Sequence, residues 1–217
     1  MALNAKKVTG TGPAAKALSA GNYMARVVQV LDLGVQAQLP YEGKAKPPVR
    51  KLRLVYELGT EFMDDDDGNP DTQRPRWVGE DFPLYNLGSE RAKSTLRYNA
   101  MDPAGTYEGD FAQLGGAPCL VAIVNKVKGD KVYNNVGAVS APIAGLPVPE
   151  LVNPITIFDL DSPDMEVFNA LPDWLKDIIK ANLEYEGSPL QQAITGVAPP
   201  PAPPVEDVPD LDEDLPL

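Results

Sequence analysis

Apolar and polar positions alternate through the first two thirds of the chain, and this pattern predicts β-strands. The segment 22–38 (NYMARVVQVLDLGVQAQ) is rich in β-branched and long apolar residues, which predicts a long first strand with a bulge or bend at Gly34. In segment 49–58 the even positions from 52 to 58 are apolar and predict a core face. The odd positions form the opposite face, which carries the cations Lys51 and Arg53.

The pattern then predicts a turn, a third strand, a helix and two final strands. Segment 64–71 (DDDDGNPD) is typical of a turn, segment 75–87 of a strand, and segment 89–102 has helical spacing with Ser89 as a plausible N-cap. Segment 117–142 contains two apolar runs joined at Gly129 and Asp130, which indicates a hairpin. The predicted order β-β-β-α-β-β is mainly β and is the pattern of a five-stranded OB-fold-like barrel with one helix between strands three and four.

We expect four parts along the chain. Residues 1–20 form a flexible N-terminal arm, residues 21–142 the barrel, residues 143–194 a connector with a short helical extension, and residues 195–217 a Pro-rich linker with an acidic tail. In the extension we expect Ser162 to cap a helix whose apolar stripe Pro172 divides into two. These helices could pack on the barrel or on a partner, and a homodimer through residues 163–183 stays open.

Charge is distributed unevenly along the chain. The net charge is −12, of which residues 1–140 carry +1 and residues 141–217 carry −13. Binding to phosphates needs a cationic surface. The total net charge argues against nucleic acid, whereas the distribution of charge does not. Asp64 to Asp67 hold four acids in one predicted loop, so the rest of the first part is more basic than its sum.

Composition excludes most catalytic and metal-site classes. The chain has no histidine and a single cysteine, Cys119, which lies in an apolar run and is expected in the core rather than as a nucleophile. Aligned on Gly68, the acidic loop lacks the first and last ligands of an EF-hand, where Met63 and Arg74 stand. We therefore expect no enzyme, no metal and no cofactor.

Hydropathy argues against a membrane location. No run approaches the roughly 20 apolar residues that span a bilayer, and the first 21 residues lack the apolar core of a signal peptide. We expect a cytoplasmic protein.

Basic side chains stand beside aromatic ones in the strands and loops where an OB barrel presents its nucleic-acid face. Cations can follow phosphates, and rings can stack on bases without regard to sequence. The predicted DNA-binding residues are Tyr41, Lys44, Lys46, Arg50, Lys51, Arg53, Arg74, Arg76, Trp77, Lys126, Lys128, Lys131 and Tyr133. For Trp77 and Tyr133 a place in the core is an equally good interpretation, with the cations merely solubilising.

The C-terminus combines acids with apolar residues on a proline-rich tether. The predicted partner-binding residues of this tail are Asp210, Leu211, Asp212, Glu213, Asp214, Leu215 and Leu217. Acids next to a final apolar pair suit capture in a basic pocket with a hydrophobic floor. The tail could instead serve only solubility, or fold back on the cationic groove of its own chain.

Segments 21–36 (GNYMARVVQVLDLGVQ), 81–87 (DFPLYNL) and 93–103 (KSTLRYNAMDP) and the acidic tail resemble bacteriophage single-stranded DNA-binding proteins of OB fold. The resemblance implies protection of replication and recombination intermediates and recruitment of replication or recombination proteins through the tail. Bacterial single-strand-binding proteins typically end Asp-Ile-Pro-Phe. This chain ends Asp214-Leu215-Pro216-Leu217, without the terminal aromatic.

The sequence therefore predicts sequence-independent binding of single-stranded DNA. The alternative is an OB-like adaptor or virion structural protein that binds other proteins and no DNA. An acidic mimic of DNA ranks last, because such a protein needs its acids on the folded body and here they concentrate in the tail.

Overall fold

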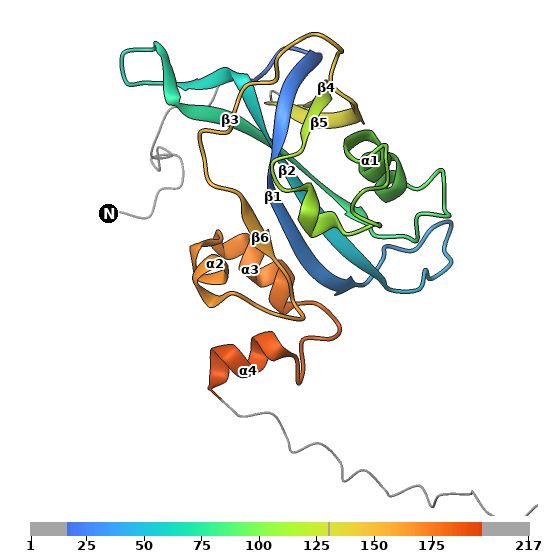
Figure 1. The fold of residues 1–217 in the computed structure, drawn as a ribbon. Helices are drawn as coiled ribbons and strands as arrows, with labels where there is room; N and C mark the ends of the chain where they lie inside the picture. The colour runs from blue at the N-terminus through green and yellow to red at the C-terminus, as the bar shows by residue number, and fades with distance from the viewer. Residues whose placement is uncertain (1–16, 130, 197–217) are drawn as a thin grey trace, which may run out of the picture.

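Long antiparallel strands build the body of the molecule (Figure 1). The computed structural model describes residues 17–129 and 131–196. The strands are β1 (Gly21–Gln36), β2 (Val49–Asp64), β3 (Pro70–Pro83), β4 (Pro118–Lys128), β5 (Lys131–Ser140) and β6 (Thr156–Phe158). The helices are α1 (Lys93–Met101), the 3-10 helix η2 (Phe111–Leu114), α2 (Met165–Ala170), α3 (Asp173–Lys180) and α4 (Pro189–Thr195).

Five strands form one curled sheet in the order β3-β2-β1-β4-β5, and α1 lies between β3 and β4 in the chain. The first strand is central, because it pairs antiparallel with β2 along most of its length and with β4 along its first half. Its register shifts between Asp32 and Val35, where Gly34 adopts a left-handed φ of 72°. This bulge lets β1 bend across the barrel, as its sequence predicts. The mainly β, OB-like architecture is confirmed.

Alternation along the strands separates an inner from an outer face. Leu54, Tyr56 and Leu58 of β2 are fully buried in the barrel core, together with Cys119 of β4. Burial raises the pKa of the Cys119 thiol to about 12, so this side chain is a core residue as expected.

Helix α1 closes the open side of the sheet between the two edge strands. Arg97 of α1 donates to the Glu80 carboxylate on β3 at 2.7 Å and to the carbonyl of Gly137 on β5 at 3.4 Å. Tyr98, the next residue, packs edge-on against Phe111 of η2 with ring centroids 5.1 Å apart. The helix therefore holds together two strands that do not pair with each other.

The C-terminal extension packs on the outer face of the barrel. Strand β6 pairs in parallel with residues 29–31 of β1, and Leu31 and Leu33 of β1 form a second core with apolar residues of the extension. Figure 1 shows α2 and α3 against β6, with α4 beyond them and the connector running from β5 across the sheet to β6. Of the two alternatives for these helices, packing on the barrel is the one observed.

Several element boundaries differ from the predictions. Ser89 lies in a turn and is not an N-cap, because α1 begins only at Lys93. Asp164 rather than Ser162 caps α2, since its carboxylate accepts from the N–H groups of Glu166 and Val167. Pro172 does separate α2 from α3. The short strand β6 and helix α4 have no counterpart in the predictions, and β3 runs from 70 to 83 instead of 75 to 87.

The described part of the predicted N-terminal arm includes an anchored residue. Leu18 is buried, its N–H donates to the side chain of Asn134 at 2.9 Å, and its carbonyl accepts from the amides of Asn125 and Asn134. Residue 18 thus belongs to the body. Residues 1–16 lie outside the described residues.

Candidate nucleic-acid interface

Ten cations belong to the predicted DNA-binding set, and the structure divides them into two classes. Arg50 and Arg53 form ion pairs with acidic side chains. The other eight form no ion pair within 4.0 Å with any residue that the structure describes. These eight are Lys44, Lys46, Lys51, Arg74, Arg76, Lys126, Lys128 and Lys131. Within residues 17–129 and 131–196, their charges are therefore not neutralised by an ion pair.

A tight turn between β1 and β2 presents one aromatic ring with two cations. The backbones of Tyr41 and Lys44 exchange two hydrogen bonds of 2.9 Å, and the intervening Glu42 and Gly43 adopt left-handed conformations. The ammonium of Lys46 lies 4.9 Å from the centroid of the Tyr41 ring, which is 60% exposed. The turn therefore holds an exposed ring next to positive charge.

The β4–β5 hairpin gathers three further lysines with a tyrosine. The register pairs Lys126 with Tyr133 and Lys128 with Lys131, so these four side chains share one face of the hairpin. Tyr133 is 47% exposed. For this residue, the interpretation as a core side chain is wrong.

The β2–β3 hairpin carries Arg74, Arg76 and Trp77 on β3. The Trp77 indole is 41% exposed and donates its N–H to Glu57 at 3.0 Å. Glu57 is almost fully buried, because the connector covers it: the N–H groups of Val152 and Asn153 and the amide of Asn153 all donate to its carboxylate. Trp77 is therefore a surface residue whose ring is anchored by a buried acid.

The strand register separates these groups along the barrel. Ala25 pairs with Leu58 and Gly21 with Ile123, so the β2–β3 and β4–β5 hairpins both extend beyond the start of β1. Gln36 pairs with Val49, so the Tyr41 turn lies at the opposite end. The structure thus places the Tyr41 turn at one end of the sheet and the tips of the two hairpins at the other, and it does not bring all the predicted residues together.

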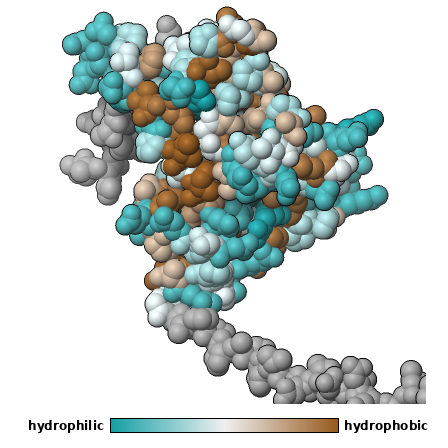
Figure 2. Space-filling model, viewed as in Figure 1, coloured by the Kyte–Doolittle hydropathy of each residue, from teal (hydrophilic) through white to brown (hydrophobic). Residues whose placement is uncertain are grey.

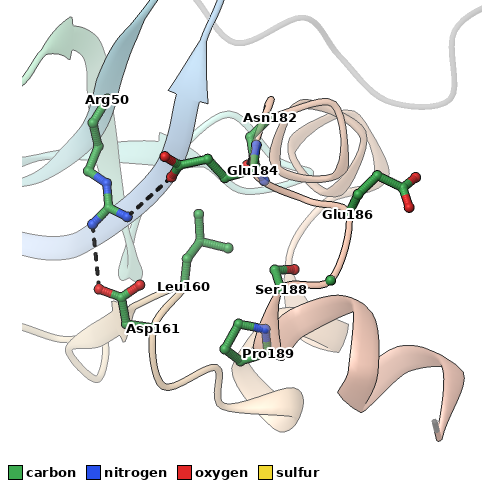
Figure 3. A pocket seen from close by; sticks show the side chains of 9 residues that line it. Arg50, Leu160, Asp161, Asn182, Glu184, Glu186, Ser188 and Pro189 are labelled. Carbon is green, nitrogen blue, oxygen red and sulfur yellow. Dashed lines mark hydrogen bonds and ion pairs between the residues drawn. The ribbon is translucent and has the colours of Figure 1, made fainter. Parts of the chain in front are cut away.

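Arg50 points into the extension instead of outward (Figure 3). Its guanidinium lies 3.4 Å from Asp32, 3.7 Å from Asp161 and 3.8 Å from Glu184, beside a cavity of about 180 Å³. Burial lowers the pKa of Arg50, but the three acids outweigh that effect and raise it. Arg50 therefore ties the extension to the barrel, and it does not form part of an open cationic face.

Arg53 is also engaged within the protein. Its guanidinium pairs with Asp81 and lies over the ring of Trp174 at 4.9 Å from the centroid. Its side chain is only 20% exposed. Like Arg50, Arg53 is thus held by both a barrel residue and a residue of the extension.

Sequence reasoning missed two features of this surface. Arg97, on the helix predicted over residues 89–102, is not in the predicted set, and it is buried against Glu80. Trp174 lies in the apolar stripe predicted for the extension, yet it is half exposed over Arg53. Only the isolated tryptophan in a charged segment could have signalled the second feature.

The structure adds three observations about other site types. No group of three metal-ligating side chains occurs in residues 17–129 and 131–196. No helix in this part of the chain is long and apolar enough to cross a membrane. The predicted tail residues, from Asp210 to Leu217, lie outside the described residues.

The chain was compared with models of known protein families, with curated proteins and with solved structures. None of these comparisons found a match.

Proposed function

We propose that this chain is a sequence-independent single-stranded DNA-binding protein that acts by binding, without catalysis. One observation carries the proposal: exposed aromatic rings stand at both ends of an OB-like sheet beside cations that form no ion pair with any described residue. The eight unpaired cations would follow phosphates, and Tyr41, Trp77 and Tyr133 would stack on bases. Each stack contributes on the order of 1–3 kcal/mol whatever the base.

Single strands are the form of DNA that suits this surface. In a duplex the bases are paired and stacked on one another, so exposed rings gain contact only with unpaired bases. The Tyr41 turn and the two hairpins lie at opposite ends of the sheet. This separation also favours a flexible strand that can run from one end to the other.

The resemblance extends the proposal to a biological setting. We place the protein in bacteriophage DNA replication and recombination, in the cytoplasm of a bacterial host, with the acidic tail recruiting partner proteins. The uneven charge supports this division of roles, since residues 141–217 carry a net charge of −13 and residues 1–140 a net charge of +1.

The decisive experiment is an anisotropy titration of a labelled dT oligonucleotide and of a labelled duplex, at low and moderate salt. We expect tight binding to the single strand that weakens as salt rises, because the bound cations release condensed counterions. A folded protein with no salt-sensitive affinity for either probe would contradict the proposal.

A matched pair of variants tests whether single-stranded DNA binds at the predicted residues. Tyr133→Ala removes a ring beside Lys126 and should weaken single-strand binding by about 5- to 150-fold, the equivalent of one stack. Tyr85→Ala removes a ring of similar exposure, 44%, outside the predicted set and should leave affinity unchanged. Equal effects of both variants would assign the binding to another surface.

The connector favours a second candidate, a protein-interaction adaptor. Figure 2 shows apolar side chains in a band along the path that the connector takes in Figure 1. Ile143, Leu146, Val152 and Ile155 of this segment are each about half exposed. Exposed apolar patches are typical of protein-binding surfaces. Failure of the DNA titration would favour this candidate.

A further inference from the structure

Trp174 lies at the edge of the extension, outside its core. The following residues of α3, Leu175 and Ile179, are buried against β1, whereas Trp174 is 50% exposed. Its ring is directed to the barrel, where the guanidinium of Arg53 lies 4.9 Å from its centroid. One face of the indole is therefore covered by Arg53, and the exposed surface of Trp174 belongs to its other face and its edges.

Arg53 is held in place by the outer face of the sheet. It pairs with Asp81 across the β2–β3 ladder. It also lies against Gly79, where any Cβ would be 2.7 Å from its Nη2 atom. A larger residue at 79 would therefore displace the guanidinium. Because Asp81 neutralises Arg53, its role here is to position the indole.

Trp77 borders the same outer face. It precedes Gly79 by two positions on β3, so both point to one side of the sheet, roughly 6.6 Å apart along the strand. Its indole N–H is fixed by Glu57, whose carboxylate also accepts from the connector. The sheet and the extension thus each contribute one anchored and partly exposed indole to this face.

On the sheet face, the charges around Trp77 and Arg53 leave Lys51 free of ion pairs with described residues, while α3 carries the exposed acids Asp173 and Asp177 next to Trp174. Lys51, two residues before Arg53 on the same face of β2, forms no ion pair with any described residue. The acids of the sheet face are already engaged, Asp81 by Arg53 and Glu57 by Trp77 and the connector. On α3, the exposed Asp173 lies 3.5 Å from Lys176.

We propose that Trp174 is a base-stacking residue, so that the C-terminal extension completes the DNA-binding face of the barrel. This inference rests on the proposed function and adds one residue to the same site. A ring held in advance by Arg53 loses little freedom when a base stacks on it, which favours binding. Trp174 of α3 therefore contributes to the site, and the buried Leu175 and Ile179 attach the helix to the barrel.

Two variants with a single tryptophan each test the contact directly, because the chain has only two tryptophans. Trp77→Phe leaves Trp174 as the sole emitter, and Trp174→Phe leaves Trp77. Each is titrated with a labelled dT oligonucleotide until its anisotropy saturates, while tryptophan emission is recorded. We expect the emission of Trp174 in the Trp77→Phe protein to be quenched as the oligonucleotide binds.

Affinity supplies the second readout. Trp174→Ala should weaken binding by about 5- to 150-fold, and Trp174→Phe, which keeps a stacking face, should weaken it less. Leu183→Ala is the control, since Leu183 is another exposed apolar residue of the extension, 57% exposed. Thermal melts of all three variants establish that the barrel stays folded.

The outcomes separate this inference from the proposed function. If the Trp77→Phe protein binds the oligonucleotide without any change in Trp174 emission, and Trp174→Ala binds like wild type, the inference is wrong while DNA binding stands. If wild-type protein binds no oligonucleotide, both fail.

Discussion

Glu80 is the residue on which three elements converge. Its carboxylate accepts from the Tyr56 hydroxyl of β2 at 2.9 Å and from Arg97 and Lys93 of α1 at 2.7 and 2.6 Å. The side chain is 5% exposed. Burial alone would raise the pKa of Glu80, but the hydrogen bonds from Arg97 and Lys93 outweigh it and hold the pKa below its ordinary value.

Replacing this acid should destabilise the fold. Glu80→Gln leaves Arg97 buried without a counter-charge, which we expect to lower the free energy of unfolding by about 3 kcal/mol. In a thermal melt this corresponds to a fall of roughly 6–12 °C. Glu90→Gln, an exposed acid without an ion pair in the described chain, is the control and should melt like wild type.

The same variant makes a prediction about pH. Because the folded pKa of Glu80 lies below the ordinary value of 4.5, its carboxylate stabilises the fold above that pH. This contribution is lost as the pH falls through the folded pKa. The melting temperature of Glu80→Gln should therefore fall less than that of wild type below about pH 4.5. Parallel acid-induced losses would show that Glu80 is not the titrating group.

At the scale of elements, the β4–β5 hairpin and the extension use their charges in opposite ways. Lys126, Lys128 and Lys131 of the hairpin have no acidic partner among the described residues. The extension instead brings Asp161 and Glu184 to Arg50. The hairpin is therefore suited to an external anion, and the charges at Arg50 are suited to attachment.

The hairpin lysines should determine part of the salt dependence. Replacing both Lys128 and Lys131 with Gln removes two phosphate contacts, so the slope of log K against log salt should become shallower by about 1.4 for a single strand. Arg91→Gln, an exposed cation outside the predicted set, is the control and should leave the slope unchanged. A wild-type slope in the double variant would exclude the hairpin from the interface.

The ion pair between Arg50 and Asp32, which helps attach the extension, requires a charged carboxylate to be buried. Asp32 is 8% exposed, and burial raises its pKa more than the Gly34 N–H and Arg50 lower it. Asp159 and Asp161 raise the pKa further. The ionised form of Asp32 is thus less favourable in the folded chain than in water, and protonation at low pH removes this cost of burying the charge.

For the whole molecule, the distribution of charge matters more than its sum. Residues 204–217 contain six acids and no cation, and they would repel DNA or compete with it for the cationic clusters. Deleting this segment should leave affinity for a dT oligonucleotide unchanged or increase it, most at low salt where screening is weakest. A large loss of affinity in the anisotropy titration would assign the segment a direct role in DNA binding.

Sequence alone determined the five main strands, their order along the chain and the barrel core. Alternation in segment 49–58 separated core from surface because side chains on a strand point alternately to its two sides. Gly34 marked the bulge because glycine adopts a left-handed φ without steric cost. The single cysteine in an apolar run indicated a core residue for the same local reason. Each of these inferences depends on neighbours in the chain.

Only the tertiary structure decided which charged and aromatic residues face solvent. Arg50, Arg53 and Arg97 look like the unpaired lysines in sequence, but their acidic or aromatic partners lie 17 to 134 positions away. In the sequence Trp174 looks like a core residue of an amphipathic helix, but in the fold its ring lies on Arg53 of the barrel. Long-range pairing has no signature in local spacing, because it depends on how the curled sheet and the extension pack together. The sequence thus determined the barrel and the positions of its cations, and packing decided which of these cations are engaged within the protein.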